Sequence, residues 1–127
     1  MNVVKYILGT LIAVLCTACM ANGGAERITA QDAKSRMEAN PHAVILDVRT
    51  EEEYRTGHIK GAVLLPLDRL EREAEAVLPD KNAEILVYCR SGRRSAEAGT
   101  ILVGLGYTKV ADFGGIMVWP YDIEKTE

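Results

Sequence analysis

The chain has 127 residues, the ordinary size of one domain, so we expect a single folded unit and not two. Hydrophobic residues make up 48% and charged residues 26% of it, which excludes a wholly disordered, collagen-like or multi-span membrane protein. The formal net charge is −3 and no long basic run could neutralise a row of phosphates, so nucleic acid is not an expected partner.

The first 21 residues have the three-part layout of a secretory signal. Lys5 precedes an apolar stretch from Tyr6 to Leu15, and small residues follow up to Ala21. This apolar stretch is too short for a membrane helix, which needs about 20 residues to cross the hydrocarbon core. We therefore predict that residues 1–21 are a signal peptide and that residues 22–127 form one mature domain.

The end of the signal is compatible with two kinds of cleavage. The sequence around Cys19 resembles a bacterial lipoprotein signal, in which Cys19 carries the lipid, although Cys16 stands where that signal usually has leucine. The alternative is an ordinary cut after Ala21. Both alternatives predict export, and a lipid anchor at Cys19 would be the only link to a membrane. After an ordinary cut Cys89 is the one remaining cysteine, so it is either an inert core residue or a reactive group.

Helices and strands alternate along the rest of the chain. Capping residues, helical spacing of apolar residues and helix-ending glycine or proline predict helices over 29–39, 50–57, 68–78 and 95–105. Apolar runs predict buried strands over 43–46, 62–65, 85–88 and 110–112. Short connections between them predict an α/β fold, with a parallel sheet covered by helices on both faces. The acidic residues Glu51, Glu52 and Glu53 are expected on a solvated helix face.

The segment after the third strand is the candidate for chemistry, because open parallel sheets bind ligands at the carboxyl ends of their strands. Cys89 ends that strand, and residues 90–94 connect it to a helix expected to begin near Ser95. Backbone N–H groups of such a loop can converge on an anion, with Gly92 supplying a positive φ. The helix dipole and three arginines add positive potential, which lowers a thiol pKa from about 8.5 and favours the nucleophilic thiolate.

Several motifs of this sequence resemble those of single-domain rhodaneses, the sulfurtransferases that carry sulfur as a cysteine persulfide. Their active-site loop is similar to Cys89-Arg90-Ser91-Gly92-Arg93-Arg94-Ser95. Other matching blocks are Asp47-Val48-Arg49, the segment from Glu53 to Ala62, and Gly114-Gly115 followed by Trp119. The resemblance extends from Ile28 to Trp119, and the export signal makes the chain similar to the periplasmic phage-shock-type rhodaneses.

The resemblance implies a rhodanese-like open parallel sheet of about five strands and a sulfurtransferase activity. Cys89 would take a sulfur from a small anionic donor such as thiosulfate or polysulfide and pass it to a thiol or to cyanide. Contacts with the donor would come from the loop residues Arg90, Ser91, Gly92, Arg93, Arg94 and Ser95. Asp47, Arg49 and His58 would be structural residues near the site, and Trp119 part of the core or of the pocket rim. No metal or cofactor is implied, and with only two histidines a ligand cluster would be hard to assemble.

Two other functions stay open. Dual-specificity phosphatases and arsenate reductases share the rhodanese fold, but their loops follow the pattern C-x5-R, and Ser95 stands where that arginine would be. The second alternative is a sulfur-sensing or sulfur-carrier binding module with little turnover. Retention of Cys89 argues against an inactive scaffold, and a direct assay of sulfur transfer would separate these alternatives.

Overall fold

The computed structural model describes residues 24–126. The predictions about the signal peptide and about Cys19 therefore concern residues outside the described part. The helices are α2 (Ala30–Ala39), α3 (Glu51–Thr56), α4 (Leu67–Val77), α5 (Arg93–Gly104) and the short 3-10 helix η1 (Ile116–Val118). The strands are β1 (Glu26–Arg27), β2 (Val44–Asp47), β3 (His58–Ile59), β4 (Val63–Leu64), β5 (Glu84–Cys89), β6 (Lys109–Gly115) and β7 (Ile123–Glu124). None of the helices in residues 24–126 is long and apolar enough to span a bilayer.

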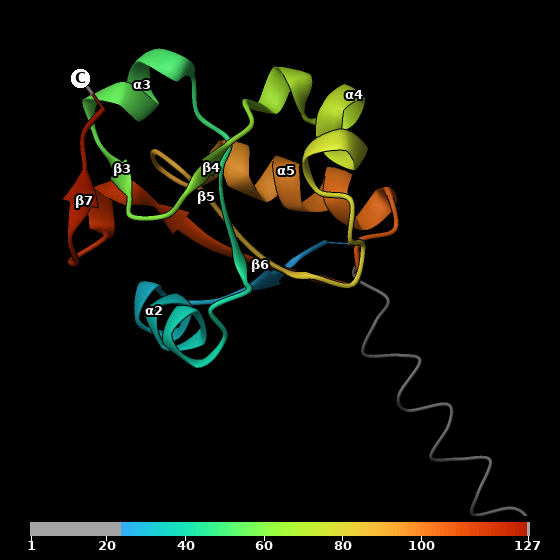
Figure 1. The fold of residues 1–127 in the computed structure, drawn as a ribbon, viewed down its shortest axis with the longest axis horizontal. Helices are drawn as coiled ribbons and strands as arrows, with labels where there is room; N and C mark the ends of the chain where they lie inside the picture. Colours follow the sequence, from blue (N-terminus) through green and yellow to red (C-terminus); the bar gives the residue numbers. More distant parts are fainter. Residues whose placement is uncertain (1–23, 127) are drawn as a thin grey trace, which may run out of the picture.

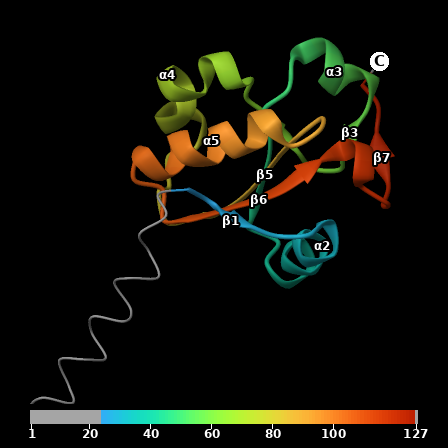
Figure 2. The ribbon, with the colours of Figure 1, turned by 180° about the vertical axis from the view of Figure 1, so that it is seen from behind.

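The main sheet has five strands in the order β1-β6-β5-β2-β4, all paired in parallel. Helix α2 lies against one face of this sheet, and α4 and α5 lie against the other (Figures 1 and 2). The predicted α/β fold, a parallel sheet with helices on both faces, is therefore confirmed. A second, two-stranded antiparallel sheet pairs β3 with β7.

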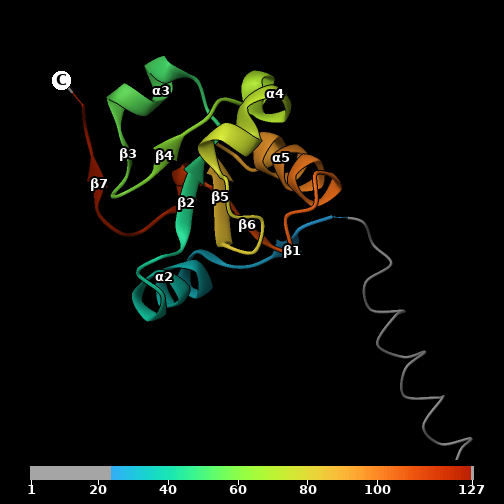
Figure 3. The same cartoon turned by 45° about the vertical axis from the view of Figure 1, so that its right-hand side comes forward.

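Strand β5 is at the centre of the sheet and is buried on both faces (Figure 3). Ile85, Val87 and Cys89 belong to the apolar cluster that includes residues of α4 and α5. Leu86 and Tyr88 belong to the cluster that includes residues of α2. This two-sided burial explains why β5 reads as an uninterrupted apolar run. It also fixes Cys89 on the sheet face that α5 covers.

Several elements differ from the sequence prediction. The two-residue strands β1, β3 and β7 are too short to produce a recognisable pattern of apolar residues in the sequence, and none of them was predicted. Strand β6 extends to Gly115 and not only to Asp112. Helix α5 begins at Arg93 and not near Ser95, because Gly92 adopts a φ of 112° and turns the chain directly into the helix. The connecting loop after Cys89 is thus residues 90–92, and Arg93 and Arg94 are helical.

Candidate active site

The site lies where parallel strands end at the same edge of the sheet. Strand β5 ends at Cys89, and its neighbours β2 and β6 end at Asp47 and Gly115. Helix α5 then begins only four residues after Cys89. The Cys89 side chain is completely buried, with an exposed fraction of 0%. The sulfur is therefore held between a strand end and a helix N-terminus, as the sequence predicts.

Hydrogen-bond donors surround the Cys89 sulfur. The backbone N–H of Gly92 donates to Sγ at 3.0 Å, and the Ser95 hydroxyl oxygen lies 3.5 Å from Sγ. The backbone amides of Ser91 and Ser95 also act on the pKa of the thiol, in the direction that favours the thiolate. The left-handed conformation of Gly92 aims these N–H groups at one point, as in an anion nest. We call Cys89 and residues 90–95 the sulfur cradle.

The cradle changes the acidity of the thiol. Burial by itself raises the pKa of Cys89, because the interior solvates a thiolate poorly. Hydrogen bonds from the Ser95 hydroxyl and from the amides of Ser95, Gly92 and Ser91 outweigh burial, so the pKa of Cys89 is lowered overall. The thiolate fraction at neutral pH is correspondingly larger than for an ordinary cysteine, and thiolates are the nucleophilic form.

Replacing Ser95 by alanine should raise the pKa of Cys89, because the hydroxyl makes the largest of the lowering contributions. The pH profile of alkylation by iodoacetamide measures this, since only the thiolate reacts, and the profile should move to higher pH. Ser91→Ala is the control, because Ser91 acts through its backbone amide. Superimposable profiles for Ser95→Ala and the unmodified protein would show that the hydroxyl does not stabilise the thiolate.

The three arginines of the cradle have different environments. Arg94 donates two hydrogen bonds to the Glu53 carboxylate, at 2.7 and 2.9 Å. Arg90 and Arg93 are exposed, and neither forms an ion pair with another residue between 24 and 126. Free positive charge at the site is thus carried by Arg90 and Arg93. The expectation that Glu53 is merely solvated is wrong, because this carboxylate is half-buried against Arg94.

Glu53 has a second role at the start of α3. Its side chain accepts from the Thr50 backbone N–H, while Thr50 Oγ1 accepts from the Glu53 N–H, which completes the predicted capping box. The hydrogen bonds from Arg94, and then those from Thr50, lower the pKa of Glu53 from 4.5 to about 2. One carboxylate therefore links the N-terminal turns of α3 and α5.

Replacing Glu53 by glutamine should destabilise the protein at pH 7 by about 1–2 kcal/mol, since the ion pair with Arg94 becomes a hydrogen bond between a charged guanidinium and a neutral amide. The folded-state pKa of Glu53 is below its unfolded value, so its contribution is complete above pH 4.5 and disappears as pH falls toward 2. Urea denaturation at pH 7 and pH 3 should show the difference shrinking at the lower pH. Glu52→Gln, in the same helical turn, controls for the loss of charge, and an equal effect there would contradict the role of Arg94.

Asp47 and Arg49 form a buried pair, as the structural interpretation predicts. Arg49 Nη2 donates to Asp47 Oδ2 at 2.7 Å and to the Gly57 carbonyl at 2.7 Å. The Tyr88 hydroxyl also donates to Asp47, and burial followed by the Asp47 charge raises the pKa of Tyr88. This network ties the ends of β2 and α3 to β5 beside the cradle.

His58 and Trp119 make their contacts away from the sulfur. The His58 ring stacks on Tyr54 with centroids 3.7 Å apart, and its Nδ1 lies 2.8 Å from the Tyr54 carbonyl oxygen. The Trp119 ring packs on Phe113, 5.3 Å between centroids, in the cluster on the α2 face. Both residues thus have framework contacts, as the sequence interpretation expected.

Gly115 supports the cradle in a way that sequence reasoning did not anticipate. A Cβ atom on Gly115 would lie 2.1 Å from the Arg90 carbonyl oxygen, so the two backbones touch. Two residues later, the Met117 N–H donates to the same oxygen at 3.3 Å. The Gly114-Gly115 element is therefore the surface on which the loop rests. Within residues 24–126 no group of three or more His, Cys, Asp or Glu side chains could hold a metal ion.

Comparisons with known proteins agree with this geometry. A family model described as a rhodanese-like domain matches residues 29–120. The chain is 41% identical over 71 residues to the thiosulfate sulfurtransferase PspE of Escherichia coli, which covers 56% of this chain and 68% of that protein. It is 33% identical over 105 residues to the adenylyltransferase and sulfurtransferase UBA4 of Candida albicans, but spans only 24% of that protein's length.

A solved structure is similar as well. The structure of a rhodanese with anions from Escherichia coli has a TM-score of 0.62 at 36% identity, and the match covers 65% of this chain and 98% of that one. The family match spans most of the sequence and includes the strand end, the cradle and the glycine pair beneath it. The chain therefore belongs to the rhodanese-like domain family.

Proposed function

We propose that the protein is a sulfurtransferase that moves a sulfane sulfur from thiosulfate or a related donor to a thiol or cyanide through a persulfide on Cys89. The observation that carries this proposal is the set of groups that favour a thiolate at Cys89: the Gly92 N–H, which donates to Sγ at 3.0 Å, the amides of Ser91 and Ser95, and the Ser95 hydroxyl, whose oxygen lies 3.5 Å from Sγ. These donors stabilise a thiolate before the reaction and a negatively charged persulfide after it. The sulfurtransferase name of the PspE relative supports the same activity.

The proposed reaction has two steps. The Cys89 thiolate attacks the outer sulfur of thiosulfate, an S–S bond forms, and sulfite leaves with the electron pair of the broken bond. The acceptor then attacks the outer sulfur of the persulfide, and Cys89 leaves as a thiolate. The exposed Arg90 and Arg93 attract the anionic donor, while the amides of the cradle hold the charge on the sulfur. Neither step requires an external oxidant or reductant.

The geometry disfavours phosphoryl transfer. In the C-x5-R pattern the arginine would occupy position 95, where the structure has a fully buried serine whose hydroxyl faces Sγ. A sulfur-carrier module with little turnover has the same cradle, so only turnover separates it from an enzyme.

Intact mass after incubation with thiosulfate tests the persulfide directly. We expect a gain of one sulfur atom, reversed by a thiol, followed by repeated thiocyanate release when cyanide is present. A single turnover without further release would indicate a carrier. Phosphate release from a phosphate ester without thiocyanate formation would overturn the assignment.

We also propose that the protein is exported, either free in the periplasm or anchored through a lipid at Cys19. The layout of residues 1–21 supports this proposal. The first residue and mass of the purified mature chain distinguish lipidation at Cys19 from an ordinary cut that leaves Asn22 first. An unprocessed chain in the cytoplasm would contradict export.

A further inference from the structure

Asp112 is a buried carboxylate that the proposed reaction does not use. It lies on β6, and its side chain is 3% exposed. Its neighbours Ala111 and Phe113 belong to the cluster on the α2 face, so the Asp112 side chain points to the opposite face, which α5 covers. Val87, its partner in register on β5, belongs to the cluster on that face, as does Cys89. Asp112 and Cys89 therefore share one face of the sheet on neighbouring strands.

One of the two Asp112 carboxylate oxygens has a hydrogen-bond partner and the other has none. Oδ1 accepts from the Gly114 backbone N–H at 2.9 Å. Oδ2 is buried and finds no partner among residues 24–126. Burial of a polar atom without a partner costs free energy of folding, and an apolar side chain at this strand position would avoid that cost. Stability by itself therefore does not account for a carboxylate here, and the bond to Gly114 is the contact that remains to be explained.

This bond closes a bulge in β6. Asp112 pairs in register with Val87 on β5. The next pair is Gly115 with Cys89, so two residues of β6 lie opposite one residue of β5. Gly114 lies in the bulge with a φ of 87°, which glycine reaches without steric cost. The Asp112 side chain accepts from the N–H two residues ahead, as in an Asx turn, and so fixes the point at which the chain leaves the regular strand.

The bulge contacts the sulfur cradle at three points. The Gly114 carbonyl oxygen lies 3.4 Å from the Ser95 hydroxyl oxygen. A Cβ atom on Gly92 would lie 3.7 Å from the Gly114 Cα, so these two backbones are in van der Waals contact. Gly115 touches the Arg90 carbonyl. Gly92 and Ser95 carry groups that favour the thiolate, so a shift of the bulge would move those groups relative to the sulfur.

We propose that Asp112 is a positioning residue for sulfur transfer, which acts through the bulge at Gly114 to hold the cradle in the shape that stabilises the thiolate and the persulfide. The inference rests on the proposed sulfurtransferase function and adds to it a residue outside the loop motif. The role requires a lone pair at Oδ1 and not a negative charge, because the Gly114 N–H needs only an acceptor. Asparagine supplies such an acceptor, and alanine does not.

Asp112→Ala and Asp112→Asn test the proposal together. Asp112→Ala should lower kcat/KM for thiosulfate about tenfold, less than the loss expected for a 1 Å misplacement of reacting groups. The pH profile of Cys89 alkylation should move to higher pH in the same variant. Asp112→Asn keeps the acceptor and should retain the activity and the alkylation profile of the unmodified protein.

Val110→Ala is the matched control. Val110 is buried on the same face of β6, two residues before Asp112, and packs in the apolar cluster on the α5 side. Its truncation leaves a cavity and should lower the midpoint of urea denaturation without moving the alkylation profile. Asp112→Ala should lower that midpoint less, because the unpartnered Oδ2 is removed together with the bond. The two variants thus separate loss of stability from loss of positioning.

Three results would overturn the role of Asp112. They are an unchanged activity and profile in Asp112→Ala, an Asp112→Asn protein as impaired as Asp112→Ala, and an equal shift of the profile in Val110→Ala. Alkylation needs no sulfur donor, so the profiles can be read whether or not the protein transfers sulfur. Absence of persulfide and thiocyanate formation in the unmodified protein would instead overturn the sulfurtransferase proposal.

Discussion

Replacing Cys89 by serine is expected to abolish sulfur transfer, with a loss of thiocyanate production of at least about 10³-fold, as for removal of other enzyme nucleophiles. A serine hydroxyl is not ionised at neutral pH, and it cannot form the S–S bond that holds the transferred atom. The donors that lower the pKa of the Cys89 thiol do not compensate for this chemical difference. The substitution therefore removes the nucleophile while leaving residues 90–95 of the cradle in place.

Intact mass and thermal unfolding check this prediction together. Cys89→Ser should gain no sulfur from thiosulfate, whereas the unmodified protein gains one atom. The serine oxygen can accept the hydrogen bond that Gly92 donates to Sγ, so the free energy of unfolding should change by no more than about 1–2 kcal/mol. A folded Cys89→Ser protein that still releases thiocyanate at the original rate would place the chemistry elsewhere in the chain.

Features of the site that depend on local sequence could be predicted. An apolar run ending in Cys89 indicates a buried central strand, and β5 is one. Gly92 supplies the positive φ of the cradle, and Thr50 with Glu53 forms the expected capping box. Each of these features is decided by residues within a few positions of one another, where backbone preferences and helix caps act.

Features that depend on contacts between distant segments could not be predicted in this way. The Glu53–Arg94 pair joins residues 41 positions apart, so Glu53 looks in the sequence like any acid on a helix surface. The contact of Gly115 with Arg90 depends on the pairing of β5 with β6, including an irregularity in register between Val87 and Cys89. The sequence contains no periodic pattern that records such a contact.

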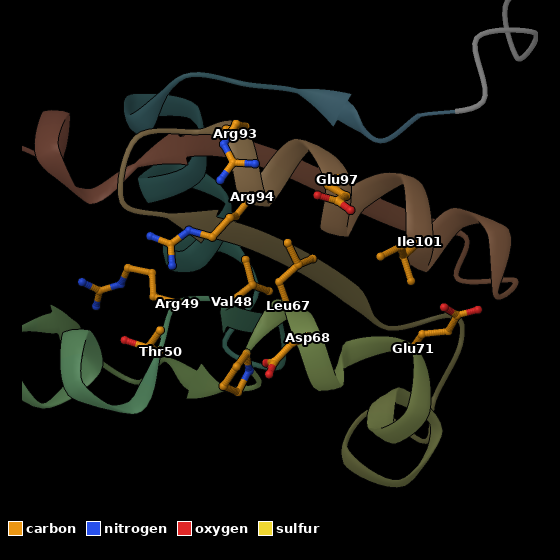
Figure 4. Close-up of a pocket in the computed structure, with 11 residues that line it drawn as sticks. Val48, Arg49, Thr50, Leu67, Asp68, Glu71, Arg93, Arg94, Glu97 and Ile101 are labelled. Atoms are coloured by element: carbon orange, nitrogen blue, oxygen red, sulfur yellow. The ribbon is translucent and has the colours of Figure 1, made fainter.

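The same distinction applies to the charged residues that line a groove along α5 (Figure 4). Arg93 and Arg94 were predicted as donor-binding residues because they are close to Cys89 in sequence. Glu71 comes from α4, and only the packing of α4 against α5 brings it to the same groove as Glu97. The charge pattern of this groove thus depends on helix packing, which the loop motif does not record.

Replacing Gly115 by alanine should reduce sulfur transfer about 100-fold, an effect of the size produced by misplacing reacting groups by about 1 Å. Gly115 has a φ of −116°, which alanine also adopts, so the effect would not arise from backbone strain. Its cause is steric: the new Cβ would lie 2.1 Å from the Arg90 carbonyl oxygen and 2.7 Å from the Ser91 Cα. The loop must move away from Gly115, and its N–H groups then no longer converge on Sγ.

Steady-state thiocyanate assays and the pH profile of Cys89 alkylation measure this displacement. Activity should fall and the pKa of the thiol should rise, because the lowering hydrogen bonds come from the displaced segment. Overpacking of this kind also costs about 1–3 kcal/mol of stability. Both assays are therefore run under conditions in which circular dichroism shows that the variant is folded.

Gly104→Ala is the matched control for this substitution. A Cβ on Gly104 meets nothing within 4 Å, and alanine at this helical position should stabilise the protein by up to about 1 kcal/mol without changing activity. Full activity of a folded Gly115→Ala protein, with an unchanged alkylation profile, would mean that the loop keeps its shape without the support of β6. The cradle would then be held by the turn at Gly92 and by Ser95 alone, since Ser95 also donates to the Gly92 carbonyl at 3.1 Å.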